Sequence, residues 1–256
     1  MSGNHAPNWP VYSSQAPAVE IVPVVDDAKH LLQMQVEING NPDMGIVFKQ
    51  GYVGYWVDYD YPLGKASSIN RVEVLGTKRI NNEECYEVKY VNAEPDGEIH
   101  PPSYWYYVKR MDKIYWVRFT YERDGQIITE EVDDSCPTPT KIRLGMYWHG
   151  HDIQRDTTTG EVYVSRHRST KAEAVVELRI GSCVYHCLQL VMFSADANGT
   201  SAHTLVEKYI DRKGLTILRR KYMGEDNVGD REQLRQSPQI KRDGREYYLW
   251  YDSVFL

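Results

Sequence analysis

The sequence has few cysteines, no long apolar run and no excess of basic residues, and each of these absences excludes a class of protein. The 4 cysteines among 256 residues are too few and too unevenly spaced for the disulfide framework of a small secreted protein. No stretch approaches the roughly 18 apolar residues that a membrane-spanning helix needs. The formal net charge is −6, with both signs interspersed, whereas nucleic-acid binding needs a basic stripe that offsets phosphate charge.

Several functional motifs are missing as well. The sequence contains no Gly-rich phosphate loop, dinucleotide fingerprint or nucleophile elbow, which disfavours nucleotide cofactors and the commonest serine hydrolase plan. Residues 1–20 have no apolar core of signal-peptide length. We therefore expect a cytoplasmic protein that has neither a membrane nor a nucleic acid as partner, and that uses no cofactor; a metal at one histidine pair is the alternative considered below.

Tyrosine is abundant by contrast. Aromatic residues make up 12% of the chain, with 20 tyrosines and 6 tryptophans against 4 phenylalanines. Tyrosine and tryptophan favour half-buried pleated surfaces, and they also line cavities in which the ring packs and the polar atom meets a partner. This composition favours β-sheet and is compatible with an internal binding cavity.

The chain contains a weak internal repeat. When residues 85–125 are slid by 102 positions without a gap, seven residues recur at the shifted position. About two or three matches are expected by chance from ordinary composition. Both copies also have three alternating apolar runs separated by two polar turns, which predicts that one β-meander is used twice. The matched residues of the first copy are Cys85, Ala93, Gly97, Tyr107, Arg110, Arg118 and Asp124.

Strand signals continue along the whole chain, separated by turn residues. Residues 26–35 could form a short helix, but the alternation over 32–38 favours a strand, and 224–244 holds at most a helical turn. The predicted strands are 21–25, 32–38, 45–49, 52–61, 70–75, 85–91, 104–110, 115–122, 127–132, 142–151, 161–166, 174–180, 184–193, 205–210, 216–222 and 246–255.

These signals predict an all-β fold with little helix, built from two similar antiparallel β-meander halves. The halves are expected to form a strongly bent sheet, one barrel or a pair of half-barrels. We expect an N-terminal arm at 1–20, a first half at 21–135 and a second half at 141–256, in one continuous pseudo-repeat domain. An exposed edge strand has unpaired backbone groups, so we expect other segments of the chain to cover the sheet edges. The alternative is a homodimer in which two copies pair through an edge.

A second offset, of 92 positions, aligns a strand of the first half with a strand of the second. Alternate side chains of a strand share a face, so His149 and His151 lie on one face together with Tyr147. The corresponding face of the first copy carries Val57 and Tyr59. If this face looks inward, the second half has imidazoles where the first has inert side chains. His149, His151 and Tyr147 are therefore the candidate catalytic residues.

Three interpretations of the two imidazoles remain open. Imidazole titrates near neutral pH, so either ring could act as a general acid or base, with Tyr147 donating to a developing oxyanion. A His-x-His pair could instead hold a metal with a third ligand such as His167, although the pair alone is a weak motif. The third interpretation is that both rings are half-solvated polar residues near a strand end.

Aromatic and cationic residues on neighbouring strands are candidate ligand contacts. The band 104–107 must put two rings on each face of its strand, so at least one face is lined by rings. Arg118 and Arg220 form a repeated pair that would hold an acidic group inside a barrel, or make ordinary cross-strand ion pairs outside it. The candidate ligand-binding residues are Tyr55, Tyr59, Tyr107, Trp116, Arg118 and Arg220.

Asp58 and Asp60 share a strand face, as acid–base pairs and hard-cation sites do. A solvated outer face of an antiparallel strand has the same pattern, and we favour this second interpretation for the two carboxylates.

Two functions fit these observations. The first is a cofactor-independent enzyme of the lyase, isomerase or hydrolase type, in which a histidine transfers a proton to or from a small apolar or aromatic molecule. The second is a non-catalytic binding protein or carrier that holds such a molecule in the same Tyr/Trp-lined cavity. The direction in which Tyr147, His149 and His151 point distinguishes the two.

Overall fold

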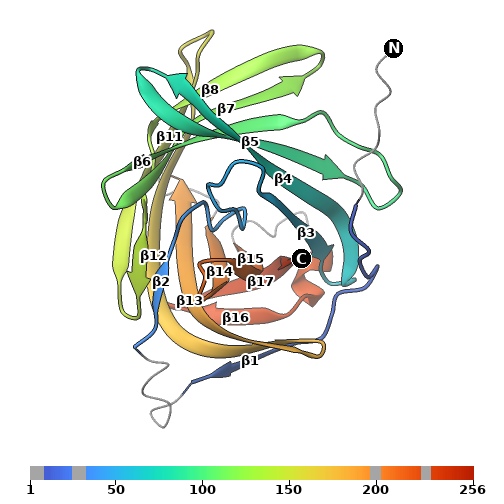
Figure 1. Ribbon diagram of the computed structural model, residues 1–256. Coiled ribbons are helices and arrows are strands. Elements are labelled where there is room, and N and C mark those ends of the chain that lie inside the picture. The colour runs from blue at the N-terminus through green and yellow to red at the C-terminus, as the bar shows by residue number, and fades with distance from the viewer. Residues whose placement is uncertain (1–8, 25–32, 197–202, 226–231) are drawn as a thin grey trace.

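The computed structural model describes residues 9–24, 33–196, 203–225 and 232–256, and nearly all of their regular structure is β-sheet. A closed 12-strand antiparallel barrel dominates the molecule (Figure 1). Each barrel strand pairs with the next barrel strand along the chain, and β17 pairs with β3 to close the wall. The all-β prediction is confirmed, and among the arrangements considered the chain adopts a single barrel.

The twelve barrel strands are β3 (Val53–Asp60), β4 (Lys65–Ile80), β5 (Glu83–Ala93), β6 (Ser103–Arg110), β7 (Lys113–Arg123), β8 (Gln126–Asp134), β11 (Tyr147–Asp156), β12 (Val162–Ile180), β13 (Cys183–Asp196), β14 (Thr204–Asp211), β15 (Thr216–Gly224) and β17 (Arg245–Phe255). The remaining elements are β1 (Val19–Pro23), β2 (Gln35–Glu37), β9 (Thr138–Pro139), β10 (Lys141–Arg143), β16 (Gln239–Arg242) and the short 3-10 helix η3 (Glu232–Gln236). No helix among the described residues is long and apolar enough to cross a membrane. The helix considered at 26–35 falls mostly on residues outside those described.

Local turn chemistry explains how consecutive strands fold back on each other. Asn81 and Asn82 join β4 to β5 with φ of 48° and 67°, and Asp124 and Gly125 join β7 to β8 with φ of 52° and 74°. Two consecutive residues of positive φ match the right-handed twist of the flanking strands, and Asn, Asp and Gly tolerate this conformation best. These pairs therefore set tight hairpins and the meander order.

The two meanders occupy equivalent stretches of the wall. The strands β5, β6 and β7 lie 102 residues before β13, β14 and β15, so each strand of the first trio has its counterpart in the second. Register shifts interrupt several pairs, including one between Tyr106 and Tyr107 and one between Tyr209 and Ile210. Such bulges bend a strand and change which side chains face inward, and they decide the composition of the interior.

The outer face of the barrel carries a second core under the N-terminal residues. Val57 and Tyr59 of β3 are buried there, and Trp9 and Tyr12 pack against the same cluster. The Tyr59 hydroxyl donates a hydrogen bond to the Ser13 carbonyl oxygen at 3.1 Å, and β1 extends the sheet by pairing with β12. The N-terminal residues therefore hide an outward-facing stripe that would otherwise be an exposed apolar patch.

Residues 34–48, which we call the closing segment, fill the interior at one end of the barrel (Figure 1). Their backbone passes close to itself: a Cβ on Gly40 would lie 1.7 Å from the Ile46 carbonyl oxygen. Only glycine fits at such an approach. The segment carries a polar turn into the interior together with apolar side chains. The buried apolar residues are Met34, Val36, Ile38, Met44 and Ile46.

Candidate functional site: the barrel cavity

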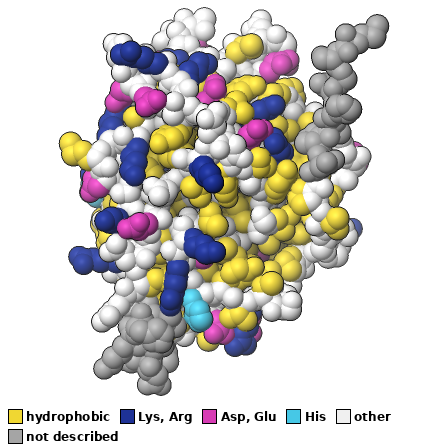
Figure 2. All heavy atoms as spheres, viewed as in Figure 1, with side chains coloured by type: hydrophobic (Ala, Val, Ile, Leu, Met, Phe, Trp, Pro, Cys, Tyr) yellow, Lys and Arg dark blue, Asp and Glu magenta, His cyan; other side chains and the backbone are white. Residues whose placement is uncertain are grey.

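The barrel interior beyond the closing segment holds a cavity of about 530 Å³. Hydrophobic side chains gather over the middle of this face of the molecule, with Lys and Arg side chains beside and among them (Figure 2). The first-half strands β3, β5, β6 and β7 contribute mainly aromatic residues: Trp56, Tyr90, Trp105, Tyr107, Trp116 and Phe119. The second-half strands contribute mainly polar and charged residues, among them Asp152, Gln154, Arg166, Arg168, Arg219 and Lys221.

The aromatic wall is a continuous stack along β6 and β7. The Trp105 ring lies 4.8 Å from the Trp116 ring and 4.5 Å from the Phe119 ring, and Phe119 stacks on Tyr121 at 4.9 Å between centroids. Both indole N–H groups of the tryptophan pair are satisfied, one by Ser103 Oγ and one by a main-chain oxygen. The polar atoms of both indoles are therefore bonded within the protein, and the rings of Trp105, Trp116 and Phe119 line the cavity.

A partly buried ionic cluster anchors the closing segment to the charged residues of the second-half strands, which we call the charged wall. The Asp43 carboxylate pairs with Lys208 and lies 3.5 Å from the Arg168 guanidinium, which also pairs with Asp152 at 2.9 Å. Burial opposes ionisation of Asp43, but the nearby Lys208 and Arg168 outweigh it and hold the pKa of this carboxyl well below its usual range. Burial lowers the pKa of Lys208, and Asp43 partly offsets that effect. The cluster is a balanced charge network that joins residues far apart in sequence.

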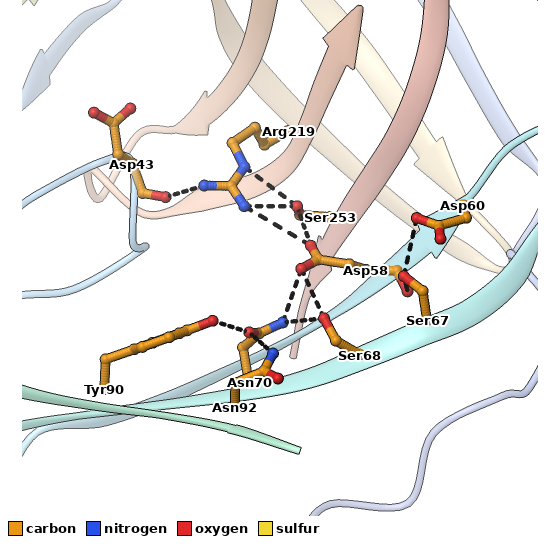
Figure 3. A network of polar contacts seen from close by, with 10 residues as sticks. All are labelled: Asp43, Asp58, Asp60, Ser67, Ser68, Asn70, Tyr90, Asn92, Arg219 and Ser253. Carbon is orange, nitrogen blue, oxygen red and sulfur yellow. Dashed lines mark hydrogen bonds and ion pairs between the residues drawn. The ribbon is translucent and has the colours of Figure 1, made fainter. Parts of the chain in front are cut away.

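A second network surrounds Asp58 of β3 (Figure 3). Asn70 Nδ2 and Ser68 Oγ donate to one carboxylate oxygen at 2.9 and 3.0 Å, and Ser253 Oγ donates to the other. The Arg219 guanidinium lies 3.8 Å from the same carboxylate and donates to the Asp43 main-chain oxygen at 2.7 Å. The pattern of β3 had favoured a solvated outer face for Asp58 and Asp60. That interpretation is wrong for Asp58, which lines the cavity.

Two cations that line the cavity form no ion pair with any carboxylate of the described residues: Arg166, which is exposed, and Lys221. The Lys221 ammonium lies 4.6 Å from the Trp250 ring centroid and 5.6 Å from that of Tyr251. Burial, and then the charges of Arg219 and Arg166, lower the pKa of Lys221 to about 8. The charged wall therefore has positive charge that its own carboxylates do not neutralise.

Polar atoms of the aromatic wall are not all satisfied. The buried indole N–H of Trp56, a cavity-lining residue, has no hydrogen-bond partner among the described residues. An unpaired buried donor costs free energy that an acceptor on a ligand or a water would recover. Among the described residues, no group of three or more His, Cys, Asp and Glu side chains could hold a metal ion.

The structure brings together two of the residues predicted to bind a ligand. Tyr107 and Trp116 both line the cavity, whereas Tyr55 and Tyr59 lie on the opposite face of β3 from the cavity residues Trp56 and Asp58. The expectation that the tyrosine face looks inward is therefore wrong, because the alternating face that carries Trp56 is the inner one.

The candidate catalytic residues lie outside the cavity for the same reason. Tyr147 is 61% exposed, and His149 is exposed as well. The His151 ring faces His167 of the neighbouring strand, with 3.1 Å between their Nε2 atoms. On β11 the cavity-lining side chains include Asp152 and Gln154 instead. The expectation that the two imidazoles point inward is wrong, because neither His149 nor His151 is among the described residues that line the cavity.

Arg118 and Arg220 also face outward, each beside a carboxylate of the next barrel strand. Arg118 pairs with Glu131 at 2.5 Å, and Arg220 lies 3.2 Å from Asp252. The cross-strand interpretation of this repeated pair therefore describes both copies. The Arg220 pair is buried, because Asp252 is 1% exposed.

Sequence reasoning missed several cavity residues. Arg219 and Lys221 alternate with Arg220 on a predicted strand, so one face of that strand had to carry two cations, and this signal was available. Asp43 gave no such signal, because it sits in a Pro- and Asn-rich stretch typical of a solvated turn. The missed residues with a part in the cavity are Asp43, Asp58, Trp105, Phe119, Arg166, Arg168, Arg219 and Lys221.

No protein-family model matches the chain, and no curated protein matches it. A solved structure described as a "putative lipoprotein" from Parabacteroides distasonis ATCC 8503 is 11% identical, with a TM-score of 0.44, over 81% of this chain and 94% of that chain.

Proposed function

We propose that this protein binds and carries a small molecule that has an aromatic or apolar body and an anionic group. The observation that carries the proposal is a cavity of about 530 Å³ with an aromatic wall on one side and uncompensated cations on the other. Binding sites for small molecules commonly measure about 300–1,000 Å³ and combine apolar walls with a few polar groups. The cavity matches this description in size and in chemistry.

The aromatic wall supports binding of a flat apolar body. Trp105, Trp116 and Phe119 present neighbouring ring faces whose polar atoms are already bonded within the protein. A planar ligand can stack on such a surface and gain about 0.5–1.5 kcal/mol per ring pair beyond its buried area.

The charged wall supports an anionic group on the same ligand. Arg168 and Arg219 are engaged with Asp43, Asp152 and Asp58, so their charge is compensated within the protein. Arg166 and Lys221 are not paired in this way, and a sulfonate, carboxylate or phosphate group would complete their electrostatic environment. The acid–base mechanism considered for His149 and His151 is no part of this proposal, because both rings lie on the outer face.

The test compares two fluorescent probes that share one ring system. We expect 8-anilinonaphthalene-1-sulfonate to bind with a Kd about tenfold lower than that of the neutral N-phenyl-1-naphthylamine, since the sulfonate adds a contact worth about 1.4 kcal/mol. Trp105→Ala should weaken binding of both probes by about 2 kcal/mol, or roughly 30-fold. Trp9→Ala removes a tryptophan from the outer face and should leave both Kd values within twofold.

Two outcomes would overturn the proposal. The first is that neither probe quenches tryptophan fluorescence at stoichiometric amounts in protein that circular dichroism shows to be folded. The second is that Trp9→Ala weakens binding as much as Trp105→Ala does, which would place the probes on the outer face.

A further inference from the structure

The barrel interior holds two lysines whose surroundings differ in one decisive respect. Lys208 is 6% exposed and pairs with the Asp43 carboxylate beneath the closing segment. Lys221 lines the open cavity, and no carboxylate of the described residues forms an ion pair with it. One amine is therefore sealed and neutralised by a partner, while the other faces the space that a ligand would occupy.

The surroundings of Lys221 increase the fraction of neutral amine. The Trp250 ring, 4.6 Å away, and Asp58 favour the ammonium, but burial and the nearby cations Arg219 and Arg166 outweigh them. A desolvated lysine beside another cation is a known arrangement for an amine nucleophile. With a pKa of about 8, about a tenth of the amine is neutral at pH 7, roughly 300 times the fraction for an ordinary lysine.

We propose that Lys221 forms an imine with an aldehyde or ketone group on a ligand held in the cavity. This inference rests on the binding function proposed above and names the ligand's reactive group. An anionic aromatic carbonyl compound meets both requirements, since its ring can stack on Trp105 and Trp116 while Arg166 faces its anionic group.

The chemistry needs no oxidant or reductant. The neutral Nζ attacks the carbonyl carbon, the carbonyl π electrons move to oxygen, and oxygen takes up a proton while nitrogen loses one, which gives a carbinolamine. Loss of the hydroxyl group with one proton, as water, then forms the C=N bond. Both proton transfers can run through water, so the step needs no further group of the protein.

The test uses 4-formylbenzoate, an aromatic aldehyde with a carboxylate, at pH 7 in the presence of cyanoborohydride. This reagent reduces an imine to a stable secondary amine that peptide mass spectrometry locates. We expect the Lys221 adduct to form about 100-fold faster than the adduct at Lys213, an exposed lysine at a turn. Lys221→Arg should abolish the fast adduct, and the matched control Lys213→Arg should leave its rate unchanged.

Equal labelling of Lys221 and Lys213, or fast labelling that survives in Lys221→Arg, would overturn the inference. Titration of the same wild-type sample with the sulfonate probe separates the two proposals. Tight probe binding without a fast Lys221 adduct would refute the imine and leave the binding function standing. Absence of both would refute the binding function together with the imine.

Discussion

The half-buried Asp43 carboxylate, paired with the buried Lys208, offers the sharpest test of how the closing segment is held. Asp43→Asn keeps the shape of the side chain but removes the negative charge that faces Lys208 and Arg168. Arg168 keeps its pair with Asp152 at 2.9 Å, whereas Lys208, at 6% exposure, loses its only carboxylate partner among the described residues. The substitution therefore creates one uncompensated buried cation.

The expected cost follows from that imbalance. Removal of one partner from a buried ion pair costs about 3–5 kcal/mol, while replacement of both partners by well-packed neutral side chains is often close to neutral. We expect Asp43→Asn to lower the free energy of unfolding by about 3–5 kcal/mol, out of the roughly 5–15 kcal/mol typical of a native protein. The double variant Asp43→Asn/Lys208→Met should recover at least about 2 kcal/mol of this loss.

Urea unfolding followed by circular dichroism measures these values, with an unchanged m-value as the check that the unfolded state is the same. Glu37→Gln is the matched control. It breaks an exposed pair with Lys141, 3.8 Å long with side chains 66% and 68% exposed, and should cost less than about 1 kcal/mol. A loss below about 1 kcal/mol for Asp43→Asn, or no recovery in the double variant, would refute the argument.

The same carboxylate makes stability depend on pH in a defined direction. Its pKa is lower in the folded protein than in the unfolded chain, so the unfolded state binds more protons in acid. Its contribution is therefore complete above the unfolded pKa of about 4 and is lost as pH falls below that value. Asp43→Asn should show a shallower loss of stability between about pH 4 and pH 2 than the wild type.

Three further predictions concern the cavity and its surroundings. Binding of the sulfonate probe should weaken up to about tenfold between pH 7 and pH 9, because Lys221 loses its charge around its pKa of about 8. The neutral probe should show no such change, and a pH-independent sulfonate Kd would contradict the role of Lys221 in binding the anion. His149→Ala and His151→Ala should leave both probe affinities within twofold, because both rings are on the outer face. A tenfold loss of affinity in either variant would show that the histidine contributes to binding. Gly40→Ala should destabilise the protein by about 2 kcal/mol or more, since its Cβ would lie 1.7 Å from the Ile46 carbonyl oxygen; an unchanged urea midpoint would contradict the close approach.

Strand positions could be predicted from sequence because they depend on local patterns. Alternation and turn residues placed the meander strands correctly, and the offset of 102 residues matched β5 to β13 and β7 to β15. Bulge positions could not be predicted in this way. The extra residue is Val117 of β7 in one half and Ile217 of β15 in the other, and these positions do not correspond under the offset of 102 residues. The equivalent tyrosines therefore face opposite ways: Tyr107 lines the cavity, and Tyr209 packs in the outer core.

The main error of the sequence analysis was the choice of which strand face points into the barrel, and this error has a physical cause. Pattern reasoning assumes that the apolar face is the inner one, yet β3 is buried on both faces, since the N-terminal residues cover Val57 and Tyr59 from outside. A shift of one residue exchanges the two faces completely. The sequence pattern allowed either the Trp56 and Asp58 face or the tyrosine face of β3 to point inward. The choice depends on packing of the N-terminal residues over Val57 and Tyr59, which the local pattern does not show.

The asymmetry of the cavity follows from divergence between two similar halves. Phe119 of β7 and Lys221 of β15 are 102 residues apart and both line the cavity, from corresponding strands of the two meanders. Two identical halves would enclose a cavity with like chemistry on both sides, and such a cavity gives a ligand no preferred direction. Because one half presents a stack of rings and the other presents cations, the interior has an apolar pole and a positive pole. A ligand that is aromatic at one end and anionic at the other can satisfy both poles in one orientation, and a purely apolar ligand can satisfy one of them.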